Sequence, residues 1–206
     1  DLQAVLLGLD PVLEDRSPAE GEWSIRRTVA HIAGAELGFY VAVRYALDQH
    51  RLGIDEPAAV PDEAWEILLG QKISSIEAVL DGSLAGIQSY RKTLVERVLG
   101  EFASIDDGGL DRPSSYWESY PLSIRFRLHR FESHLRQHIV QVTKILHALG
   151  LAPSEAVRLL RLLYAALAEV EGATIGAWDI GASQCRQAAS SIEARAAEIA
   201  TILSTE

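Results

Sequence analysis

Apolar residues recur every three or four positions along most of the chain, which is the period of an amphipathic α-helix. Few stretches alternate apolar and polar residues in the way that half-buried strands do. The expected helices lie at about 2–14, 25–50, 62–69, 71–101, 121–149, 153–170 and 182–202. The segments between them that are richest in helix-breaking residues lie at about 16–23, 51–62, 106–115 and 171–181. The pattern therefore predicts an all-α protein.

Individual residues mark the ends of these helices. Ser24 can cap the helix that follows it, because its hydroxyl oxygen can accept a hydrogen bond from a free backbone N–H. Pro121 suits the first turn of the helix that runs to about Leu149, and Gly150 is a typical residue for ending it. Long helices joined by two long connections are typical of a bundle that is not simply up-down-up-down. Since bundles build ligand sites in the core, residues on facing helices should form any site.

Three of the six histidines fall within residues 129–138, which read HRFESHLRQH. His134 and His138 are four residues apart and therefore lie on one face of the helix, one turn apart. His129 is five residues before His134, about 140° away around the helix. The pair is expected to point inward, because it belongs to an apolar stripe that comprises Phe131, His134, His138, Val142 and Ile145. The opposite face is polar, with Arg130, Ser133, Arg136 and Lys144.

Two inward imidazoles need polar partners, because an unpaired buried polar group is costly. One interpretation is a metal site, in which both rings offer a lone pair to a divalent ion. The other is a purely structural bundle, whose histidines bond to one another or to core groups. A zincin-type protease is excluded, since the Glu that its chemistry needs directly after the first histidine is replaced here by Leu135.

A third metal ligand is expected from another helix, and His31 is the candidate. The residues near it along the helix face are mostly small and leave room for a ligand or a close helix: Thr28, Gly34, Ala35 and Gly38. His50 and His147 lie beside turn residues at helix ends and are expected to be surface or capping groups. Glu36 is five residues beyond His31, about 140° around the helix, and is not expected to be a fourth ligand.

The charge and composition of the chain restrict its partners. Among 206 residues, 29 are Asp or Glu and 19 are Lys or Arg, so the formal net charge is −10. No basic cluster reverses this locally, and a nucleic-acid partner is not expected. No signal peptide or membrane span is visible, and the single cysteine, Cys185, is expected to pack in the last helix. These features favour a cytoplasmic protein, and the apolar pattern already in progress at Asp1 suggests a natural chain that begins earlier.

Two motifs resemble signatures of the DinB-like superfamily. The stretch EWSIRRTVAHIAGAE is similar to its Trp-Ser…His…Glu signature, and HLRQHIVQV is similar to its His-x-x-x-His-x-x-Gln signature. The resemblance implies a four-helix bundle that binds a divalent metal ion through three histidines. On the matching positions of this chain, these are His31, His134 and His138.

The resemblance also sets the expected domains. Residues 1–150 should form the DinB-like four-helix bundle with the metal site. Residues 151–206 lie outside the resemblance and should form an appended C-terminal hairpin of two additional helices. This alanine-rich hairpin is expected either to cover the bundle or to make a homodimer.

Members of the superfamily with known activity resemble metal-dependent transferases or isomerases that use low-molecular-weight thiols such as mycothiol and bacillithiol. Others are described as hydrolases by analogy. The resemblance thus implies a metal-dependent thiol S-transferase or hydrolase that acts on a small-molecule substrate, although it assigns no catalytic residue. The alternative is a protein that binds a metal or small ligand without turnover. Zinc is the first choice of metal, and nickel, iron and manganese are the alternatives.

Residues near the histidines are candidates for supporting roles. Gln141 lies on the His134 face and is placed either to orient a ligand imidazole or to bond to a neighbouring helix. Arg127, seven residues before His134, is placed either to meet a substrate carboxylate or to be exposed near the start of the helix. Trp23 is expected to fix its loop to the bundle rather than to support a substrate. Tyr116 and Trp117, which precede the helix of the histidine pair, are expected either to pack there or to line the mouth of the site.

Overall fold

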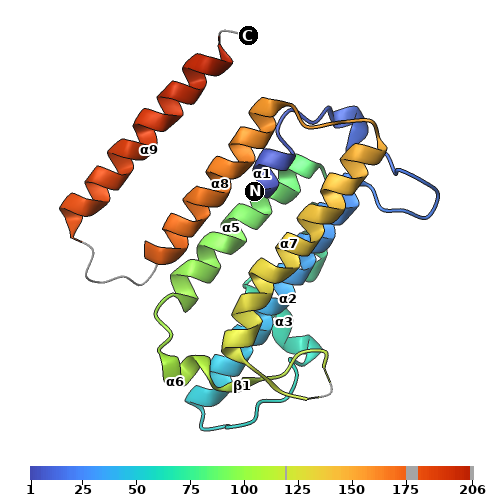
Figure 1. Ribbon diagram of the computed structural model, residues 1–206. Helices are drawn as coiled ribbons and strands as arrows, with labels where there is room; N and C mark the ends of the chain where they lie inside the picture. The colour runs from blue at the N-terminus through green and yellow to red at the C-terminus, as the bar shows by residue number, and fades with distance from the viewer. Residues whose placement is uncertain (119, 175–180, 205–206) are drawn as a thin grey trace. The chain divides into compact units, whose positions relative to one another are not determined.

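The computed structural model describes residues 1–118, 120–174 and 181–204. Nearly all of the regular structure is helical (Figure 1), so the predicted all-α class is confirmed. The chain divides into two compact units. The larger unit comprises Gly8–Ala152, and the smaller unit comprises Asp1–Leu7 together with Pro153–Glu206.

The larger unit contains one 3-10 helix, six α-helices and two short strands among the described residues. They are η1 (Pro11–Leu13), α2 (Ile25–Arg51), α3 (Asp62–Leu69), α4 (Ile73–Leu80), α5 (Leu84–Phe102), α6 (Asp107–Leu110), β1 (Pro113–Ser114), β2 (Leu122–Ser123) and α7 (Ile124–Ala148). The smaller unit contains α1 (Leu2–Val5), α8 (Glu155–Thr174) and α9 (Ala182–Leu203). β1 and β2 pair in an antiparallel ladder, which joins the two ends of the connection between them.

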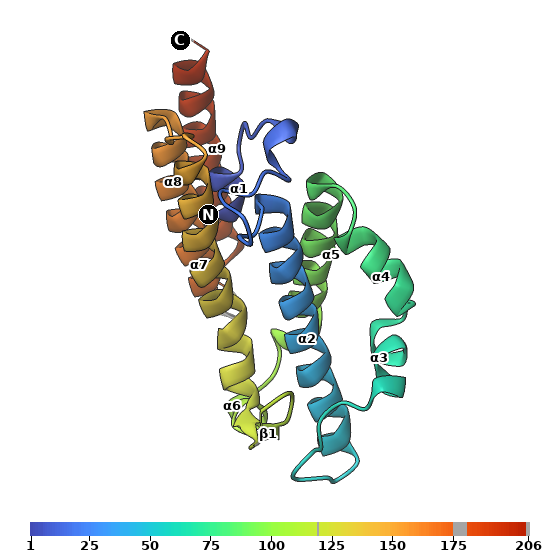
Figure 2. The ribbon, with the colours of Figure 1, turned by 90° about the vertical axis from the view of Figure 1, so that its right-hand side faces the viewer.

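α2 is the central helix of the larger unit and lies between α5 and α7 (Figure 2). As predicted, Ser24 caps its start, because the hydroxyl oxygen accepts a hydrogen bond of 3.2 Å from the N–H of Arg27. Neighbours cover α2 on several sides, so its buried residues extend beyond a single stripe. Its fully buried apolar residues include Ile25, Val29, Ile32, Tyr40, Val41 and Val43. Because of this central position, side chains of α2 can meet side chains of α7, the helix that carries His134 and His138.

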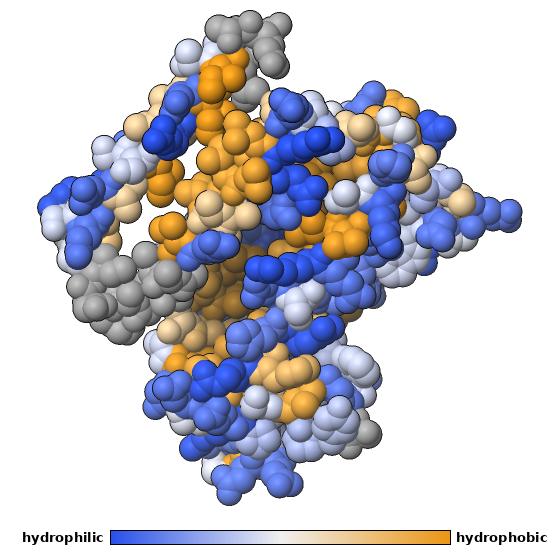
Figure 3. Space-filling view, in the orientation of Figure 1, coloured by the Kyte–Doolittle hydropathy of each residue, from blue (hydrophilic) through white to orange (hydrophobic). Residues whose placement is uncertain are grey.

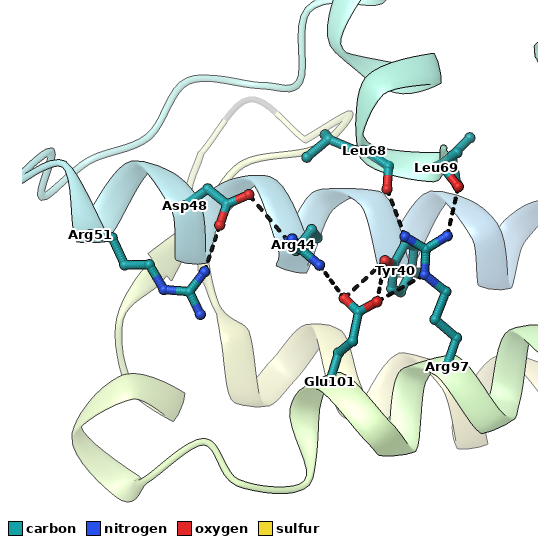
Figure 4. Close-up of polar contacts among 8 residues, drawn as sticks. All are labelled: Tyr40, Arg44, Asp48, Arg51, Leu68, Leu69, Arg97 and Glu101. Atoms are coloured by element: carbon teal, nitrogen blue, oxygen red, sulfur yellow. Dashed lines mark hydrogen bonds and ion pairs between the residues drawn. The ribbon is translucent and has the colours of Figure 1, made fainter. Parts of the chain in front are cut away.

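A polar network ties α2 to α5 and α3 (Figure 4). The hydroxyl of Tyr40 donates to Glu101 at 2.9 Å, and burial, together with this hydrogen bond, raises the pKa of Tyr40 to about 12. Arg44 and Arg97 both form ion pairs with the same carboxylate. Arg97 also donates to the carbonyl oxygens of the last two residues of α3, which have no partner inside the helix. The network therefore fixes the end of α3 against the α2–α5 pair.

Two predicted helices are interrupted, and a local residue explains each break. The predicted helix at 2–14 is wrong, because Gly8 adopts a φ of +71° and separates α1 from η1. The predicted helix at 71–101 is also wrong as a single element. Ser83 divides it into α4 and α5, since its hydroxyl accepts a hydrogen bond from the N–H of Gly86 at 3.2 Å and caps a new helix.

The start of α7 also differs from the prediction. The helix begins at Ile124, and the Ser123 hydroxyl caps it by accepting from the N–H of Phe126 at 3.2 Å. Pro121 does not form the first turn, because the two residues after it belong to β2 and pair with β1. The β1–β2 ladder therefore returns the chain directly to the first turn of α7.

In the smaller unit, α1 packs against α8. The guanidinium of Arg161 on α8 forms an ion pair with the carboxylate of Asp1, with 3.0 Å between nitrogen and oxygen. α8 extends to Thr174, so it ends later than the predicted end at about residue 170. Residues 175–180 of the predicted break lie outside the described residues. Cys185 on α9 is exposed rather than packed as predicted.

α8 and α9 also expose large apolar side chains. They are Leu159, Leu162, Tyr164, Val170, Ile192 and Ile202. In Figure 3, apolar side chains gather over α8. Within the described parts of the chain, none of the helices combines the length and the apolar character that crossing a bilayer requires.

Candidate metal centre

The structure brings together the three histidines that the sequence singles out. His31 comes from α2, and His134 and His138 come from α7. One ring nitrogen from each residue lies within 4.8 Å of those of the other two. The ring centroids are 5.1 Å apart for His31 and His134, and 4.3 Å apart for His134 and His138. The contact between α2 and α7 therefore creates a cluster of imidazoles from residues that are distant in the sequence.

His134 and His138 form the buried part of the cluster, with exposed fractions of 7% and 6%. Their spacing on α7 directs both rings to the same side, and the two Nε2 atoms face each other at 3.1 Å. Because two N–H groups repel each other at this distance, at least one Nε2 presents a lone pair. Burial, followed by the charges of neighbouring residues, above all His138, lowers the pKa of His134 to about 4. This ring is therefore neutral at pH 7, as a metal ligand must be.

Gln141 orients the ring of His138. Its Oε1 lies 2.7 Å from His138 Nδ1, which carries a proton and donates it to this hydrogen bond. The resulting tautomer leaves the lone pair on Nε2, the atom that faces His134. The Nδ1 of His134 has no hydrogen-bond partner among the described residues, and this ring instead contacts Phe39 edge to face, with 5.7 Å between centroids. Gln141 thus occupies the position of a residue that orients a ligand imidazole.

His31 forms the open side of the cluster. It is exposed, because it lines a pocket that opens to solvent. Trp23 covers one edge of its ring, with 5.0 Å between centroids, and the guanidinium of Arg27 lies over Trp23 in turn. Partial burial, and then the charge of His138, lower the pKa of His31. The neutral form of this imidazole is therefore also favoured.

The donor set fits a divalent metal ion. With metal–nitrogen bonds of about 2.0–2.1 Å, two adjacent ligand nitrogens lie roughly 3 Å apart, and the Nε2 atoms of His134 and His138 are 3.1 Å apart. Three neutral imidazoles suit zinc first and also nickel or iron, whereas manganese prefers oxygen ligands. His31, His134 and His138 would hold the ion, and the exposed side of His31 leaves room for a further ligand.

The other histidines lie outside the cluster. Two of them are exposed on α7: His129 and His147. His50 was predicted to be a surface or capping group, but it is buried, and its Nε2 donates to the carbonyl oxygen of Pro113 at 2.8 Å. The connection before α7 returns to the end of α2, and this tertiary contact buries the ring. Glu36, which was not expected to be a ligand, is buried in an ion pair with Arg91.

A pocket of about 430 Å³ opens beside the cluster, and His31 and His134 form part of its wall. The other residues that line it are Gly34, Ala35, Phe39, Tyr116, Trp117 and Arg130. Its volume is typical of small-molecule sites. Small residues of α2 leave the room, and the connection between β1 and β2 supplies the aromatic residues Tyr116 and Trp117. The cluster is therefore accessible to a molecule that enters between α2 and this connection.

Arg127 was expected either to meet a substrate carboxylate or to be exposed, but the structure gives it an internal partner. Its side chain is fully buried, and its two terminal nitrogens each lie 2.5 Å from an oxygen of Glu118. It also donates to the Ser114 hydroxyl at 3.3 Å. Glu118 follows Tyr116 and Trp117 directly, so this ion pair fastens the aromatic wall of the pocket to α7.

Arg130 and Phe39 also line the pocket, although neither was predicted as a site residue. Arg130 was assigned to the polar face of its helix, but it lines the pocket, with its guanidinium carbon 5.7 Å from the centroid of Phe39. Its position in the sequence indicates this location, because Arg130 is four residues, about one helical turn, before His134 and therefore lies on nearly the same face of the helix. Phe39 is eight residues, about two helical turns, after His31, and it also contacts Tyr116 and Phe131 of α7.

Comparison with known proteins identifies the family of the chain. The sequence model of the DinB superfamily matches residues 1–142, a range that contains all three clustered histidines. The chain belongs to the DinB superfamily. The family resemblance of the two histidine motifs is thereby confirmed. No curated protein matches this DinB-superfamily chain.

Among solved structures, the chain is similar to YfiT from Bacillus subtilis, with a TM-score of 0.50 and 19% sequence identity. The match covers 73% of this chain and 81% of the YfiT chain. YfiT is described as "a probable metal-dependent hydrolase with an unusual four-helix bundle topology". At this identity the likeness shows the fold alone, and it confirms the predicted bundle of DinB-like type.

Proposed function

We propose that this DinB-superfamily protein binds a divalent metal ion through His31, His134 and His138 and uses it to act on a small molecule. The observation that carries the proposal is the convergence of three imidazoles, two of them buried, beside an open pocket. The description of YfiT as a probable metal-dependent hydrolase supports the same class of function. Zinc is the first candidate for the ion.

When bound, a divalent ion supplies a nucleophile at neutral pH by lowering the pKa of a water molecule or thiol at an open coordination position. The residues of the chain prepare the site for this. Gln141 keeps the proton of His138 on Nδ1, so that Nε2 presents its lone pair. The burial of His134 keeps that ring unprotonated. The exposed side of His31 keeps one direction of approach open to the pocket.

The composition of the pocket supports a thiol as the nucleophile in preference to water. None of the described residues that line the pocket is Asp or Glu, so its wall offers no carboxylate as a general base. A bound divalent ion would lower the pKa of either nucleophile, but a thiol starts from an ordinary pKa of about 8.5, far below that of water, and therefore needs less help to ionise at neutral pH. We therefore propose a thiol-dependent S-transfer as the leading activity and metal-dependent hydrolysis as the second.

Elemental analysis of untagged protein and of single histidine variants tests the metal site. We expect bound metal in the wild type, and its loss or strong depletion in His31→Ala, His134→Ala and His138→Ala. His129→Ala is the matched control, because this residue is exposed on another side of α7 and should retain the metal. Equal loss of metal from the His129 variant would contradict the assignment.

A cobalt-substituted protein separates an enzyme from a simple metal binder. If the site keeps an open position, added cysteine should change the visible spectrum of the cobalt ion. Conjugation of cysteine to small electrophiles, followed with the wild type and with His138→Ala, then tests turnover. A spectrum that no thiol or small anion alters, combined with four protein ligands, would replace the catalytic proposal with a structural metal site.

A further inference from the structure

We infer that the pocket beside the three histidines takes an organic anion, a small carboxylate with a flat apolar body, and that Arg130 recognises the carboxylate. This inference rests on the proposed function, because it treats the pocket as the substrate site. It adds the chemical class of the substrate and a residue that determines specificity.

Arg130 has no carboxylate of its own among the described residues, because it shares the field of Glu118 with Arg127, which forms the ion pair. The guanidinium of Arg130 makes only a weak hydrogen bond, 3.4 Å from the Ser133 hydroxyl, and lies over the face of Phe39. It forms no ion pair with a described carboxylate, and no Asp or Glu is among the described residues that line the pocket. The carboxylate of Glu118 feels the charge of Arg130, but one carboxylate cannot neutralise both Arg130 and its ion-pair partner Arg127. A net positive charge therefore remains in a pocket of a protein whose formal charge is −10.

The shape of the pocket favours a flat apolar body. Phe39 and Tyr116 meet edge to face, with 6.4 Å between centroids, and Trp117 adds a third aromatic side chain. Gly34 and Ala35 leave the α2 side open. Aromatic walls next to small residues accommodate a planar group, which gains from contact with the ring faces and edges.

The position of Arg130 connects this recognition to the histidines. Arg130 and His134 are one turn apart on α7 and line the same pocket. A guanidinium binds a carboxylate through two parallel hydrogen bonds, which fix the direction of the ligand. A carboxylate held by Arg130 therefore places the rest of the molecule along the aromatic wall, beside His31 and His134.

Isothermal titration with benzoate and its neutral analogue benzamide tests the inference. Both probes are planar and of similar size, so the difference in affinity reports the recognition of charge. The proteins compared are the wild type, Arg130→Gln, Arg130→Lys and Arg136→Gln. Arg136 is the matched control, because it lies on the same helix but is exposed and paired with Glu132. Each protein is measured both free of metal and loaded with zinc.

We expect the wild type to bind benzoate about tenfold more tightly than benzamide, which is the usual scale of a hydrogen bond to a charged group. Arg130→Gln should remove most of this preference, Arg130→Lys should keep part of it, and Arg136→Gln should keep all of it. The dependence on Arg130 should be present with and without zinc. That pattern would support Arg130 as the residue that recognises the carboxylate.

Equal affinity of the wild type for benzoate and benzamide would overturn the inference, and this comparison does not depend on any variant folding. A preference that appears only with zinc and is unchanged in Arg130→Gln would also overturn it, because the carboxylate would then be bound to the metal. Failure of the proposed function can be distinguished from failure of this inference. A protein that binds no metal, yet keeps an Arg130-dependent preference for benzoate, would refute the metal site and support the anion pocket.

Discussion

Gly38 lies so close to Tyr116 that a Cβ atom at residue 38 would come within 1.9 Å of the tyrosine hydroxyl oxygen. The same Cβ would be 2.7 Å from the ring carbon that bears this hydroxyl. Gly38 is inside α2, and its backbone conformation does not require glycine. The glycine is instead needed for space, because it lets Tyr116 approach α2 and form one wall of the pocket.

Gly38→Ala should therefore displace Tyr116 and destabilise the protein by about 1–3 kcal/mol, the usual cost of overpacking. Urea unfolding measures the stability, and benzoate titration measures the pocket. Gly100→Ala is the control, since this glycine of α5 is exposed and an added Cβ meets nothing within 4 Å. There we expect a gain of about 0.5–1 kcal/mol from helix propensity. An unchanged pocket in Gly38→Ala would show that Tyr116 does not depend on this contact.

The ion pair between Arg127 and Glu118 predicts a large cost when only one partner is removed. Arg127→Met leaves the Glu118 carboxylate, which is only 12% exposed, without its cation. Loss of one partner of a buried pair typically costs about 3–5 kcal/mol. The double variant Arg127→Met/Glu118→Gln should lose less than the sum of the two single variants, as a double-mutant cycle in urea would measure. Simple additivity would mean that the two side chains do not interact in solution.

Gln141 should matter for metal affinity more than for folding. Gln141→Leu removes the acceptor that holds the proton of His138 on Nδ1, and loss of such a partner typically weakens metal binding by about 10–100-fold. Competition with a chelator of known affinity measures the change. Gln137→Leu is the control, because this glutamine is exposed on the same helix. Similar effects of both variants would argue against a role for the Gln141 hydrogen bond.

The stability of the metal-free protein should depend on pH through His134. Its pKa is lowered to about 4 in the folded protein, from an ordinary value of 6.5. The unfolded chain thus takes up a proton at higher pH than the folded protein, so stability is unaffected above about pH 7 and falls as pH drops from about 6.5 towards about 4. The full effect is on the order of 3 kcal/mol.

Urea unfolding between pH 7 and pH 5 measures this dependence while carboxyl groups remain largely ionised. His134→Gln should remove the larger part of the loss of stability, whereas His129→Gln, at an exposed position, should leave it unchanged. An equal slope in the wild type and in the His134 variant would mean that His134 titrates normally.

Local patterns predicted much of the fold. The repeat of apolar residues located α2 and α3 closely, because backbone hydrogen bonds and side-chain periodicity act over a few residues. The apolar repeat predicted helices that are too long where a capping serine or a glycine interrupts it, as Ser83 does before α5 and Gly8 does after α1. Periodicity continues across such a break, whereas the helix does not.

By itself, the sequence determined that His134 and His138 share an inward face, because the geometry of one helix sets the direction of side chains four residues apart. It also marked His31 as their companion through the family motif. Only the tertiary structure decided that His31 lies on the open side, that Arg127 meets Glu118, and that Arg130 turns into a pocket. These outcomes depend on how α2, α7 and the β1–β2 connection pack together. Contacts between segments that are far apart in the sequence produce no regular spacing of residues from which they could be predicted.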